Sequence, residues 1–442
     1  MPDPEQPVVS LVSLGCAKNQ VDSERIIASL VQEGFLLAED PADADIALVN
    51  TCAFLESARQ ETRDVLSELQ ALKKRSGLRA VVALGCYPSK TGVVPGADAL
   101  SAFKDYRALP ALCRKLLRLP ARKARAASPE VLGCGPRLRL GPKEVAYLKI
   151  SEGCANRCAY CAIPSIRGPL RSRPMADILK EASDLVADGA HELVLVGQDT
   201  AGYGLDLKAG KTGLAKLMSG LLGIRGYRWL RLMYAYPSHL SDEVVEYLGQ
   251  DRVAAYLDLP IQHADDGVLK AMNRPYTGAD LKTLIAKLRK KVPEIALRTT
   301  CLVGFPGETE SAFRNLRDFV QEACFDHLGA FAYSREPGTK AHGLPGQVEE
   351  AVKVERLNLL MACQKKASRK AGQARLGKVL EVLVEKAGPR FAVGRSQYQA
   401  PEVDGKVLVC GPVSRLKTLQ AGMFCRARIS SAQDYDLVGR LV

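Results

Sequence analysis

Three short apolar segments near the N-terminus each end at a cysteine, and they constrain the fold more than any other feature. The segments PVVSLVSLG (7–15), DADIALVNT (43–51) and RAVVALG (79–85) are rich in β-branched residues and predict strands; Cys16, Cys52 and Cys86 follow them. Helical patterns lie between these segments. Strands that alternate with helices pair in parallel, and their carboxyl ends share one edge of a sheet. We therefore expect three cysteines that are distant in sequence to converge on one edge.

A second alternation of strands and helices occupies the middle of the chain. Apolar runs recur at 146–151, 191–197, 227–235, 254–261, 295–304 and 327–334. Helical patterns such as MADILKEASDLVADG and DLKTLIAKLRKKV separate them. Six β/α units fall short of the eight that close a full barrel. The pattern favours an incomplete (β/α)6 barrel, with an open doubly wound sheet as the alternative.

These patterns divide the chain into four parts. Segment 121–143 is rich in proline, glycine and basic residues, which is typical of a linker. A helix is expected at 347–371, and short strand patterns broken by glycine and proline follow it, which favours a small antiparallel β-barrel. The expected parts are an N-terminal α/β domain (7–120), a linker (121–143), the partial barrel (144–371) and the β-barrel domain (372–442).

Composition indicates the cellular compartment, the role of the cysteines and the kind of partner. No apolar run approaches the roughly 20 residues that span a membrane, and the first residues show no secretory leader, so we expect a cytoplasmic protein with no membrane contact. The 13 cysteines then favour metal binding or chemistry over disulfides. The net charge of +13 suggests an anionic partner such as RNA, or serves solubility alone.

The densest cysteine motif is SEGCANRCAYCAIPSIRG at 151–168, in which Cys154, Cys158 and Cys161 have the spacing Cys-x3-Cys-x2-Cys. Three thiolates can hold three irons of a 4Fe–4S cluster and leave the fourth iron open. A structural zinc site would be closed by a fourth protein ligand, and the next candidate, His191, lies beyond a helical pattern. The spacing therefore favours an iron–sulfur cluster with one open position.

With this motif after the first barrel strand, the chain resembles the radical S-adenosylmethionine superfamily. The resemblance implies that Cys154, Cys158 and Cys161 hold a 4Fe–4S cluster and that S-adenosylmethionine chelates its open iron. It also implies that an electron from the cluster cleaves S-adenosylmethionine to a 5′-deoxyadenosyl radical. Such a radical removes hydrogen from carbons that acid–base chemistry cannot activate.

The resemblance extends over nearly the whole chain to the methylthiotransferases of this superfamily. It is carried by SLGCAKNQVDSE, LVNTCAF and LGCYPSK in the N-terminal part, by CAIPSIRGPLRSRP, LVGQDTAGYG, LDLPIQHADDGVLKAMNR and RTTCLVGFPGET in the barrel, and by the C-terminal segment, which is similar to their OB-like TRAM domain. It implies that Cys16, Cys52 and Cys86 hold a second 4Fe–4S cluster. It further implies that S-adenosylmethionine serves both as methyl donor and as radical source.

Two segments distinguish the branches of this family. SLGCAKNQVDSER and GRSQYQAPEVDGKVLV (394–409) resemble the branch that adds a methylthio group to the β-carbon of an aspartate in small-subunit ribosomal protein twelve. That protein, free or on the ribosome, is the expected partner, with RNA contact as a further expectation. The alternatives are a tRNA adenosine methylthiotransferase and a metal-binding RNA module without enzyme activity. The sequence names neither the sulfur donor nor the electron donor.

Six residues are expected to contact S-adenosylmethionine: Tyr160, Gln198, Asp199, Arg298, Thr300 and Gly304. Tyr160 lies between two cluster cysteines, where the resemblance implies an aromatic near the cluster and the adenine. Gln198 and Asp199 follow the second barrel strand, where a polar loop cap is the alternative. Arg298 and Thr300 alternate on one strand and are expected to point inward. Gly304 begins the turn GFPGE at the end of that strand. No general acid or base is assigned.

Four further polar residues stay open between function and packing. Arg167, Arg171 and Arg173 can bind phosphate or carboxylate, or they form a solvated basic face. His263 faces the expected barrel mouth, but a lone histidine is more often a core residue with its hydrogen bonds satisfied.

Overall fold

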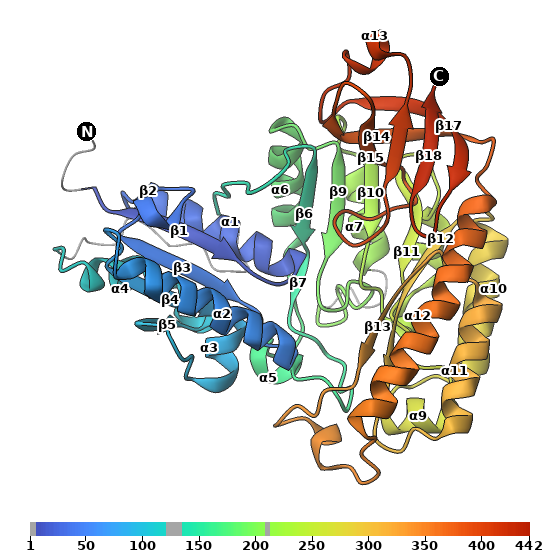
Figure 1. The fold of residues 1–442 in the computed structure, drawn as a ribbon, viewed down its shortest axis with the longest axis horizontal. Coiled ribbons are helices and arrows are strands. Elements are labelled where there is room, and N and C mark those ends of the chain that lie inside the picture. The colour runs from blue at the N-terminus through green and yellow to red at the C-terminus, as the bar shows by residue number, and fades with distance from the viewer. Residues whose placement is uncertain (1–5, 121–134, 208–212) are drawn as a thin grey trace. The chain divides into compact units, whose positions relative to one another are not determined.

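The computed structural model describes residues 6–120, 135–207 and 213–442 (Figure 1). The chain divides into two compact units. The first comprises Met1–Gly141, Ser151–Asn156 and Ala162–Glu181, and the second comprises Pro142–Ile150, Arg157–Cys161 and Ala182–Val442. Most of the expected linker lies outside the described residues, and its last part, 135–143, contains no helix or strand.

The first unit is built on a five-stranded parallel sheet with the order β2-β1-β3-β4-β5. Its elements are β1 (Val8–Ser13), α1 (Ala17–Gln32), β2 (Leu36–Leu37), β3 (Ile46–Thr51), α2 (Glu56–Lys73), β4 (Ala80–Gly85), α3 (Cys86–Thr91), β5 (Ala99–Ser101) and α4 (Leu109–Leu116), followed by the later pieces β7 (Ser151–Glu152), α5 (Ile163–Arg167) and β8 (Arg171–Ser172). The three expected strands are β1, β3 and β4. They are confirmed as neighbours in one parallel sheet.

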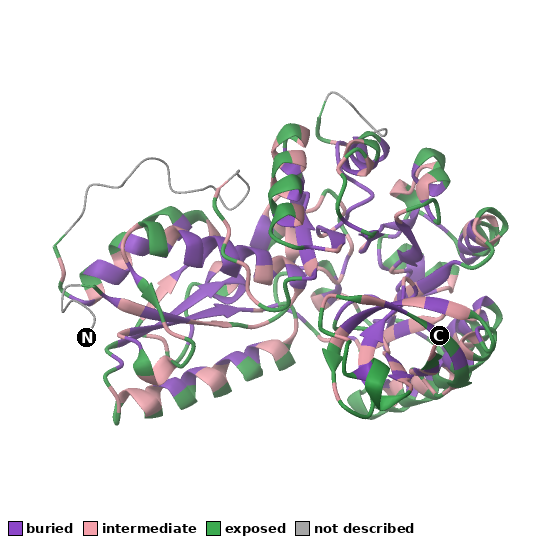
Figure 2. Cartoon of the chain, turned by 90° about the horizontal axis from the view of Figure 1, so that it is seen from above, coloured by how far each residue is buried: buried purple, intermediate pink, exposed green. Residues whose placement is uncertain are grey.

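The core of this unit lies on both faces of the sheet. Ile46 and Leu48 of β3 pack in one cluster with residues of α1 and α4, whereas Ala47 and Val49 pack in another with residues of α2. All residues of β3 and β4 are buried, as Figure 2 shows by the colour of these strands. Burial on both faces explains why these segments are continuously apolar rather than alternating.

The second unit contains a six-stranded parallel sheet with the order β13-β12-β11-β10-β9-β6. Its strands are β6 (Val145–Lys149), β9 (Glu192–Val196), β10 (Trp229–Leu232), β11 (Val253–Asp258), β12 (Ala296–Val303) and β13 (His327–Ala332). The helices of this part are α7 (Gly213–Leu222), α8 (Asp242–Tyr247), α9 (Asp266–Ala271), α10 (Gly278–Lys291), α11 (Glu310–Ala323) and α12 (Glu350–Gln373), and α6 (Met175–Ala187) begins in the first unit and ends in the second. The strand order follows the sequence without the reversal of a doubly wound sheet, so the incomplete barrel is confirmed.

The last residues form a closed barrel with the order β14-β15-β16-β18-β17. Its elements are β14 (Val379–Ala387), β15 (Ala392–Arg395), β16 (Val407–Cys410), α13 (Val413–Leu416), β17 (Phe424–Ala432) and β18 (Leu437–Leu441). The pairs are antiparallel except β16 with β18, which is parallel. The reason is geometric, because strand direction cannot alternate all the way around a closed ring of five strands.

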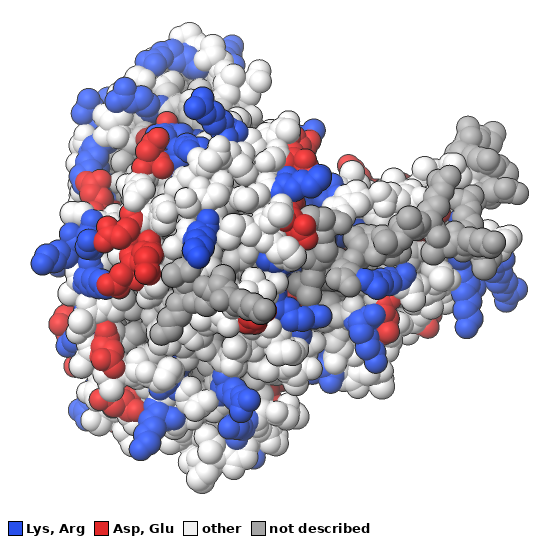
Figure 3. Space-filling view, turned by 180° about the vertical axis from the view of Figure 1, so that it is seen from behind, with Lys and Arg blue, Asp and Glu red and all other residues white. Residues whose placement is uncertain are grey.

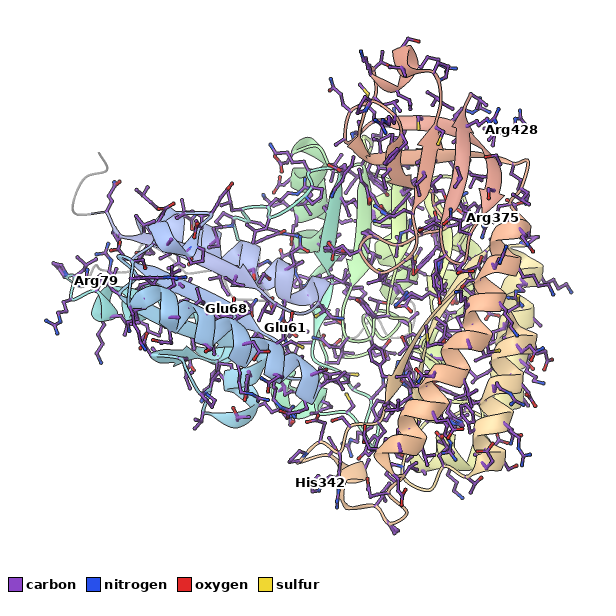
Figure 4. All side chains as sticks on the ribbon, viewed as in Figure 1. Glu61, Glu68, Arg79, His342, Arg375 and Arg428 are labelled. Carbon is purple, nitrogen blue, oxygen red and sulfur yellow. The ribbon has the colours of Figure 1, made fainter. Side chains whose placement is uncertain are left out.

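Within the second unit, the small barrel is joined to the six-stranded sheet by buried ion pairs. Glu192 at the start of β9 lies 2.6 Å from Nε of Arg231 on β10 and 2.8 Å from Nη2 of Arg395 on β15, and all three side chains are fully buried. Arg375, labelled in Figure 4 where α12 meets the small barrel, lies over the ring of Tyr398 and pairs with Asp326. The two parts therefore share one continuous buried region.

Aromatic packing adds to this junction. Trp229 on β10 meets Phe424 on β17 edge to face, with ring centroids 5.1 Å apart. The indole is almost completely buried.

None of the helices in the described ranges combines the length and the apolar character that crossing a bilayer requires.

Candidate functional site

Cys52 and Cys86 stand directly after the carboxyl ends of β3 and β4, Cys16 stands three positions after the end of β1, and the three strands are adjacent. Cys16 precedes α1, Cys52 follows β3 and Cys86 begins α3. Since β1, β3 and β4 are parallel neighbours, their carboxyl ends form one edge of the sheet. The topology therefore brings together the three cysteines that the sequence predicted to converge.

The backbone before Cys86 requires glycine. Gly85 has a φ of +89°, and a Cβ atom there would lie 2.4 Å from Oδ1 of Asn50. Thr51 closes the same turn, because its hydroxyl donates to the carbonyl of Leu84 at 2.6 Å and accepts from the backbone N–H of Tyr87 at 3.1 Å. The end of β4 is thus fixed against the end of β3.

Asn19 links the segment after β1 to the end of β3. Its Nδ2 donates to the carbonyl oxygens of Leu14 and Thr51, each at 3.0 Å, and its backbone carbonyl accepts from Nδ2 of Asn50 at 2.9 Å. Asn19 is almost completely buried. A buried amide that satisfies several backbone groups holds a loop in one conformation. Asn19 therefore fixes the spacing of the ends that carry Cys16 and Cys52.

The three thiols differ in acidity. Burial opposes ionisation of Cys16, but the charges of Lys18 and Arg167 and nearby backbone N–H groups outweigh it and lower the pKa of this thiol. Burial raises the pKa of Cys52, and it raises the pKa of Cys86 to about 12. Metal ligation requires thiolates. Iron at Cys52 and Cys86 would therefore displace protons, whereas Cys16 ionises most readily.

The Cys154–Cys161 loop begins from a short antiparallel pair in the first unit. β7 pairs with β8, and the backbone N–H of Cys154 donates to the carbonyl of Gly168 at 3.2 Å. The backbone N–H of Asn156 approaches the sulfur of Cys154 at 3.4 Å. Cys154 is half-buried, and its sulfur lies within reach of a backbone donor, an arrangement that suits a thiolate ligand.

The later half of the loop belongs to the second unit. There the backbone N–H of Cys161 donates to the carbonyl of Cys158 at 3.1 Å, and that of Ala159 donates to the carbonyl of Met272 at 2.9 Å. Both cysteines are half-buried. The turn is thus anchored to the segment after α9.

Tyr160 lies in a cluster of aromatic rings around one buried arginine. Its hydroxyl accepts from Nη2 of Arg274 at 2.5 Å, and Nη1 of Arg274 donates to the hydroxyl of Tyr276 at 2.8 Å. The same guanidinium lies 4.5 Å from the ring centroid of Tyr236. Burial raises the pKa of Tyr160 well above its usual range, so the phenol stays neutral. Sequence reasoning missed Arg274, although the segment VLKAMNR contained it.

Gln198 and Asp199 follow β9 at the carboxyl edge of the six-stranded sheet. The carboxylate of Asp199 accepts from the backbone N–H groups of Gly202 at 3.1 Å and Tyr236 at 3.3 Å, and its Oδ2 lies 2.6 Å from Nδ1 of His239. Asp199 thereby joins the loops after β9 and β10, which is the arrangement of a polar cap. Contact of either residue with S-adenosylmethionine stays a prediction.

Arg298, Thr300 and Gly304 lie at different depths along β12. Arg298 and Thr300 are less buried than their neighbours, as expected for one face of the strand, but Nη1 of Arg298 lies 2.6 Å from Asp404 of the small barrel. Gly304 follows the carboxyl end, and its N–H donates to Oε2 of Glu308 at 2.9 Å. The structure thus places Gly304 at the same edge as Gln198 and Asp199, and Arg298 towards the other end.

Glu308 and His263 show what holds that turn. Oε1 of Glu308 accepts from Arg356 at 2.8 Å, and Nε2 of the fully buried His263 lies 3.3 Å from Oε2 of Glu308. Nδ1 of His263 accepts from the backbone N–H of Asp265 at 3.0 Å. His263 is therefore a packed core residue. Glu308 was missed because a glutamate after a Gly-Pro turn carries no signal of burial.

The donor chemistry at the N-terminal edge suits an iron–sulfur cluster. Soft thiolates are the usual ligands of such clusters, and here three come from separate strand ends beside a buried cation. In the described part of the chain, no three side chains of His, Cys, Asp or Glu gather as ligands of a single metal ion. The fit to a cluster therefore rests on the thiolate chemistry of these cysteines and on their shared sheet edge.

Comparison with protein-family models assigns three parts of the chain. Residues 148–320 match the radical SAM superfamily, residues 8–98 match the uncharacterized protein family UPF0004, and residues 376–442 match the TRAM domain. The expected TRAM similarity is confirmed.

Curated relatives match the chain over nearly its full length. The chain is 41% identical over 445 residues to a ribosomal protein uS12 methylthiotransferase RimO from Geotalea uraniireducens, with 98% of each chain covered. The protein of the same description from Pelotomaculum thermopropionicum is 42% identical over 445 residues, covering 98% of this chain and 99% of that one.

Solved structures support the fold. The radical S-adenosylmethionine methyltransferase TsrM from Kitasatospora setae, solved with cobalamin and a 4Fe–4S cluster bound, aligns with a TM-score of 0.53 at 17% identity, covering 76% of this chain and 77% of that one. The cobalamin-dependent S-adenosylmethionine radical enzyme OxsB aligns with a TM-score of 0.51 at 13% identity, covering 81% of this chain and 56% of that one. At these identities the likeness extends to the fold alone.

Proposed function

Because the chain belongs to the RimO family of ribosomal protein uS12 methylthiotransferases, we propose that it adds a methylthio group to the β-carbon of an aspartate in uS12, ribosomal protein twelve of the small subunit. The chain is a radical SAM enzyme, and its cofactors are S-adenosylmethionine and 4Fe–4S clusters. The observation that carries the proposal is identity of about 40% over 98% of the chain with proteins of that one description.

We assign one cluster to each set of cysteines. Cys154, Cys158 and Cys161 hold the cluster that binds S-adenosylmethionine, and Cys16, Cys52 and Cys86 hold the second. When bound, these groups supply the electron that cleaves S-adenosylmethionine and a coordination site for the sulfur that is transferred. The support is the Cys-x3-Cys-x2-Cys spacing for the first set and the shared sheet edge for the second.

Other residues of the proposed site bind and orient S-adenosylmethionine. Gln198, Asp199 and Gly304 lie at the carboxyl edge of the six-stranded sheet, where ligands of such sheets bind. Tyr160 stays a neutral phenol beside Arg274, so it offers a hydroxyl and a ring face without adding charge. The Glu308 carboxylate fixes the N–H of Gly304 and so keeps the GFPGE turn in one shape. We propose these residues as the pocket for S-adenosylmethionine.

The basic net charge of the chain suggests where the enzyme encounters its target protein. The chain has a net charge of +13 and a ribosomal target lies near RNA in the cytoplasm. On the face drawn in Figure 3, basic side chains are spread with acidic ones between them rather than gathered in one patch. We propose that the chain acts on uS12 within the ribosome or an assembling subunit, where its basic net charge favours contact with RNA.

Intact-mass analysis of uS12 tests the proposal. Cells that contain the enzyme should yield uS12 heavier by one methylthio group in place of hydrogen, and fragmentation should place it on an aspartate. A matched strain that carries C154A, C158A and C161A should yield the unmodified mass. The proposal would be overturned in favour of the tRNA-modifying alternative if the uS12 mass were the same in both strains and the variant strain instead lacked a methylthio group on its tRNA.

A further inference from the structure

Arg167, the last residue of α5, uses every hydrogen of its two terminal nitrogens inside the first unit. Nη1 donates to Oδ2 of Asp22 at 2.7 Å and to both carboxylate oxygens of Glu152 at 3.1 and 3.0 Å. Nη2 donates to Oδ1 of Asn19 at 2.5 Å and to the sulfur of Cys86 at 3.5 Å. The side chain is almost fully buried. The guanidinium is therefore held in a single orientation.

The surroundings shield this cation from water and place two buried anions beside it. The guanidinium carbon lies 3.7 Å from the ring centroid of Phe103, and the carboxylates of Asp22 and Glu152 are as deeply buried as the cation. Charges shielded from water interact more strongly than exposed ones, because the local dielectric constant is low. A fixed positive charge and an N–H donor thus stand at one sulfur of the proposed second cluster.

The same residues flank the other cysteine loop in sequence. Glu152 precedes Cys154 by two positions, and Arg167 follows Cys161 by six. The base of this loop is closed in the first unit by β7 with β8 and by the bond from Cys154 N–H to the carbonyl of Gly168. The loop that carries one set of cysteines is therefore flanked by Arg167, which contacts Cys86 of the other set, and by Glu152, which pairs with Arg167.

We propose that Arg167 sets the reduction potential of the cluster held by Cys16, Cys52 and Cys86, through its hydrogen bond to Cys86 and its buried charge, with Glu152 opposing it. The inference rests on the proposed assignment of that cluster. Hydrogen bonds to cluster sulfurs and the net local charge are among the factors that set iron–sulfur potentials. Reduction adds one negative charge, so a fixed cation stabilises the reduced form and a fixed anion destabilises it. Arg167 acts on the cluster through Cys86 and does not touch the substrate, so its role is that of a positioning residue.

The test is a redox titration of the full chain in a background with C154A, C158A and C161A, so that only the second cluster is loaded. Dithionite supplies the one electron that reduces the cluster, and electron paramagnetic resonance follows the reduced form. R167Q removes the charge and the N–H donor. It should disfavour reduction at least tenfold, which for one electron is a fall of about 59 mV.

Two further variants separate charge from structure. E152Q keeps Arg167 but removes an opposing anion, so the potential should rise. R167K keeps the charge without the forked donor and is the substitution that best preserves folding; its potential should fall by less than that of R167Q. The matched control is R171Q, which removes a charge from an exposed arginine of the same motif and should leave the potential unchanged.

The outcomes are distinct. Opposite shifts in R167Q and E152Q with an unchanged control support the inference, and if R167Q does not fold, R167K and E152Q decide in the same way. A potential that is the same in R167K and E152Q as in the parent background overturns this inference alone. Failure of the parent background to bind iron overturns both the cluster assignment and this inference.

Discussion

At the scale of single residues, the ligand positions depend on neighbours that have no ligand chemistry. Gly153 stands directly before Cys154 with a φ of +72°, and a Cβ atom there would lie 2.1 Å from the carbonyl oxygen of Pro169. Only glycine tolerates both the left-handed backbone and that distance. Cys154 can therefore take its position only because Gly153, the residue before it, has no side chain.

We predict that G153A destabilises the protein by about 2 kcal/mol or more, because left-handed strain adds to a steric overlap with backbone that cannot move aside. Denaturant unfolding of the metal-free chain measures the change, and iron per chain after reconstitution should fall. G168A is the matched control. Gly168 lies in the same loop with a φ of +81°, but a Cβ atom there meets nothing within 4 Å. Equal effects of the two variants would contradict the steric argument.

The cysteines were predictable from the sequence and their supporting residues were not. The strand ends predicted that Cys16, Cys52 and Cys86 converge, since each follows an apolar run, and the family resemblance implied that they are cluster ligands. Arg167 looked like one of several basic residues, because its partner Asp22 lies 145 positions away. One signal was available: Asn19, Asp22 and Ser23 share a face of α1 with apolar Ile26, and polar residues on a core face indicate a buried network.

At the scale of elements, the longer strands were predictable and the edges of the N-terminal sheet were not. β1, β3 and β4 have six residues each, enough to show a β-branched run. β2 and β5 have two and three residues, too few for any periodicity, and they exist because a neighbouring strand offers unpaired backbone groups. Tertiary pairing rather than local preference determines such short strands.

The connection between β15 and β16 docks the small barrel onto the six-stranded sheet. The carbonyl of Gln397 accepts from Nη1 of Arg231 at 2.8 Å, and the side chain of Asp404 is fully buried. Oδ1 of Asp404 accepts from Arg298 at 2.6 Å, and Oδ2 accepts from the hydroxyl of Tyr256 at 2.8 Å. The segment that distinguished the two family branches in sequence is thus also the segment that carries this contact.

We predict that D404N lowers the free energy of unfolding by about 3 kcal/mol, because an amide places a donor where Asp404 only accepts and leaves the largely buried Arg298 with only the more distant carboxylate of Asp258 at 3.8 Å. Denaturant unfolding followed by circular dichroism measures the loss. D434N is the control. Asp434 pairs with Lys365 at the surface, where ion pairs contribute little, so its unfolding curve should match that of the parent chain. A D404N curve that also matches would refute the docking role.

At the scale of the whole molecule, the chain provides two cysteine sets in different structural settings. Cys16, Cys52 and Cys86 follow three neighbouring strands of one parallel sheet, whereas Cys154, Cys158 and Cys161 lie between the two strands of the antiparallel pair β7 and β8. Alternation of strands and helices predicted both parallel sheets, the short strand patterns after residue 372 predicted the small barrel, and the family resemblance related that barrel to the TRAM domain. The parallel pair of β16 with β18 could not be expected from short strand patterns, because it follows from closure of the ring.

We predict that the two cysteine sets separate in function. C154A, C158A and C161A together should abolish reductive cleavage of S-adenosylmethionine, since they remove the thiolates that would hold its cluster. C16A, C52A and C86A together should retain cleavage but give no methylthio product. Iron per chain should fall from about eight to about four in either variant. Cleavage that is lost in both variants, with iron still bound, would contradict the separation.

The position of the single tryptophan has a spectroscopic consequence. Trp229 is almost completely buried against Phe424, with its strand in the six-stranded sheet and its partner ring in the small barrel. Its emission is consequently an internal reporter of whether the TRAM domain is seated. A red shift without loss of helical signal would mark an undocked domain on an intact barrel, and no extrinsic label is needed to see it.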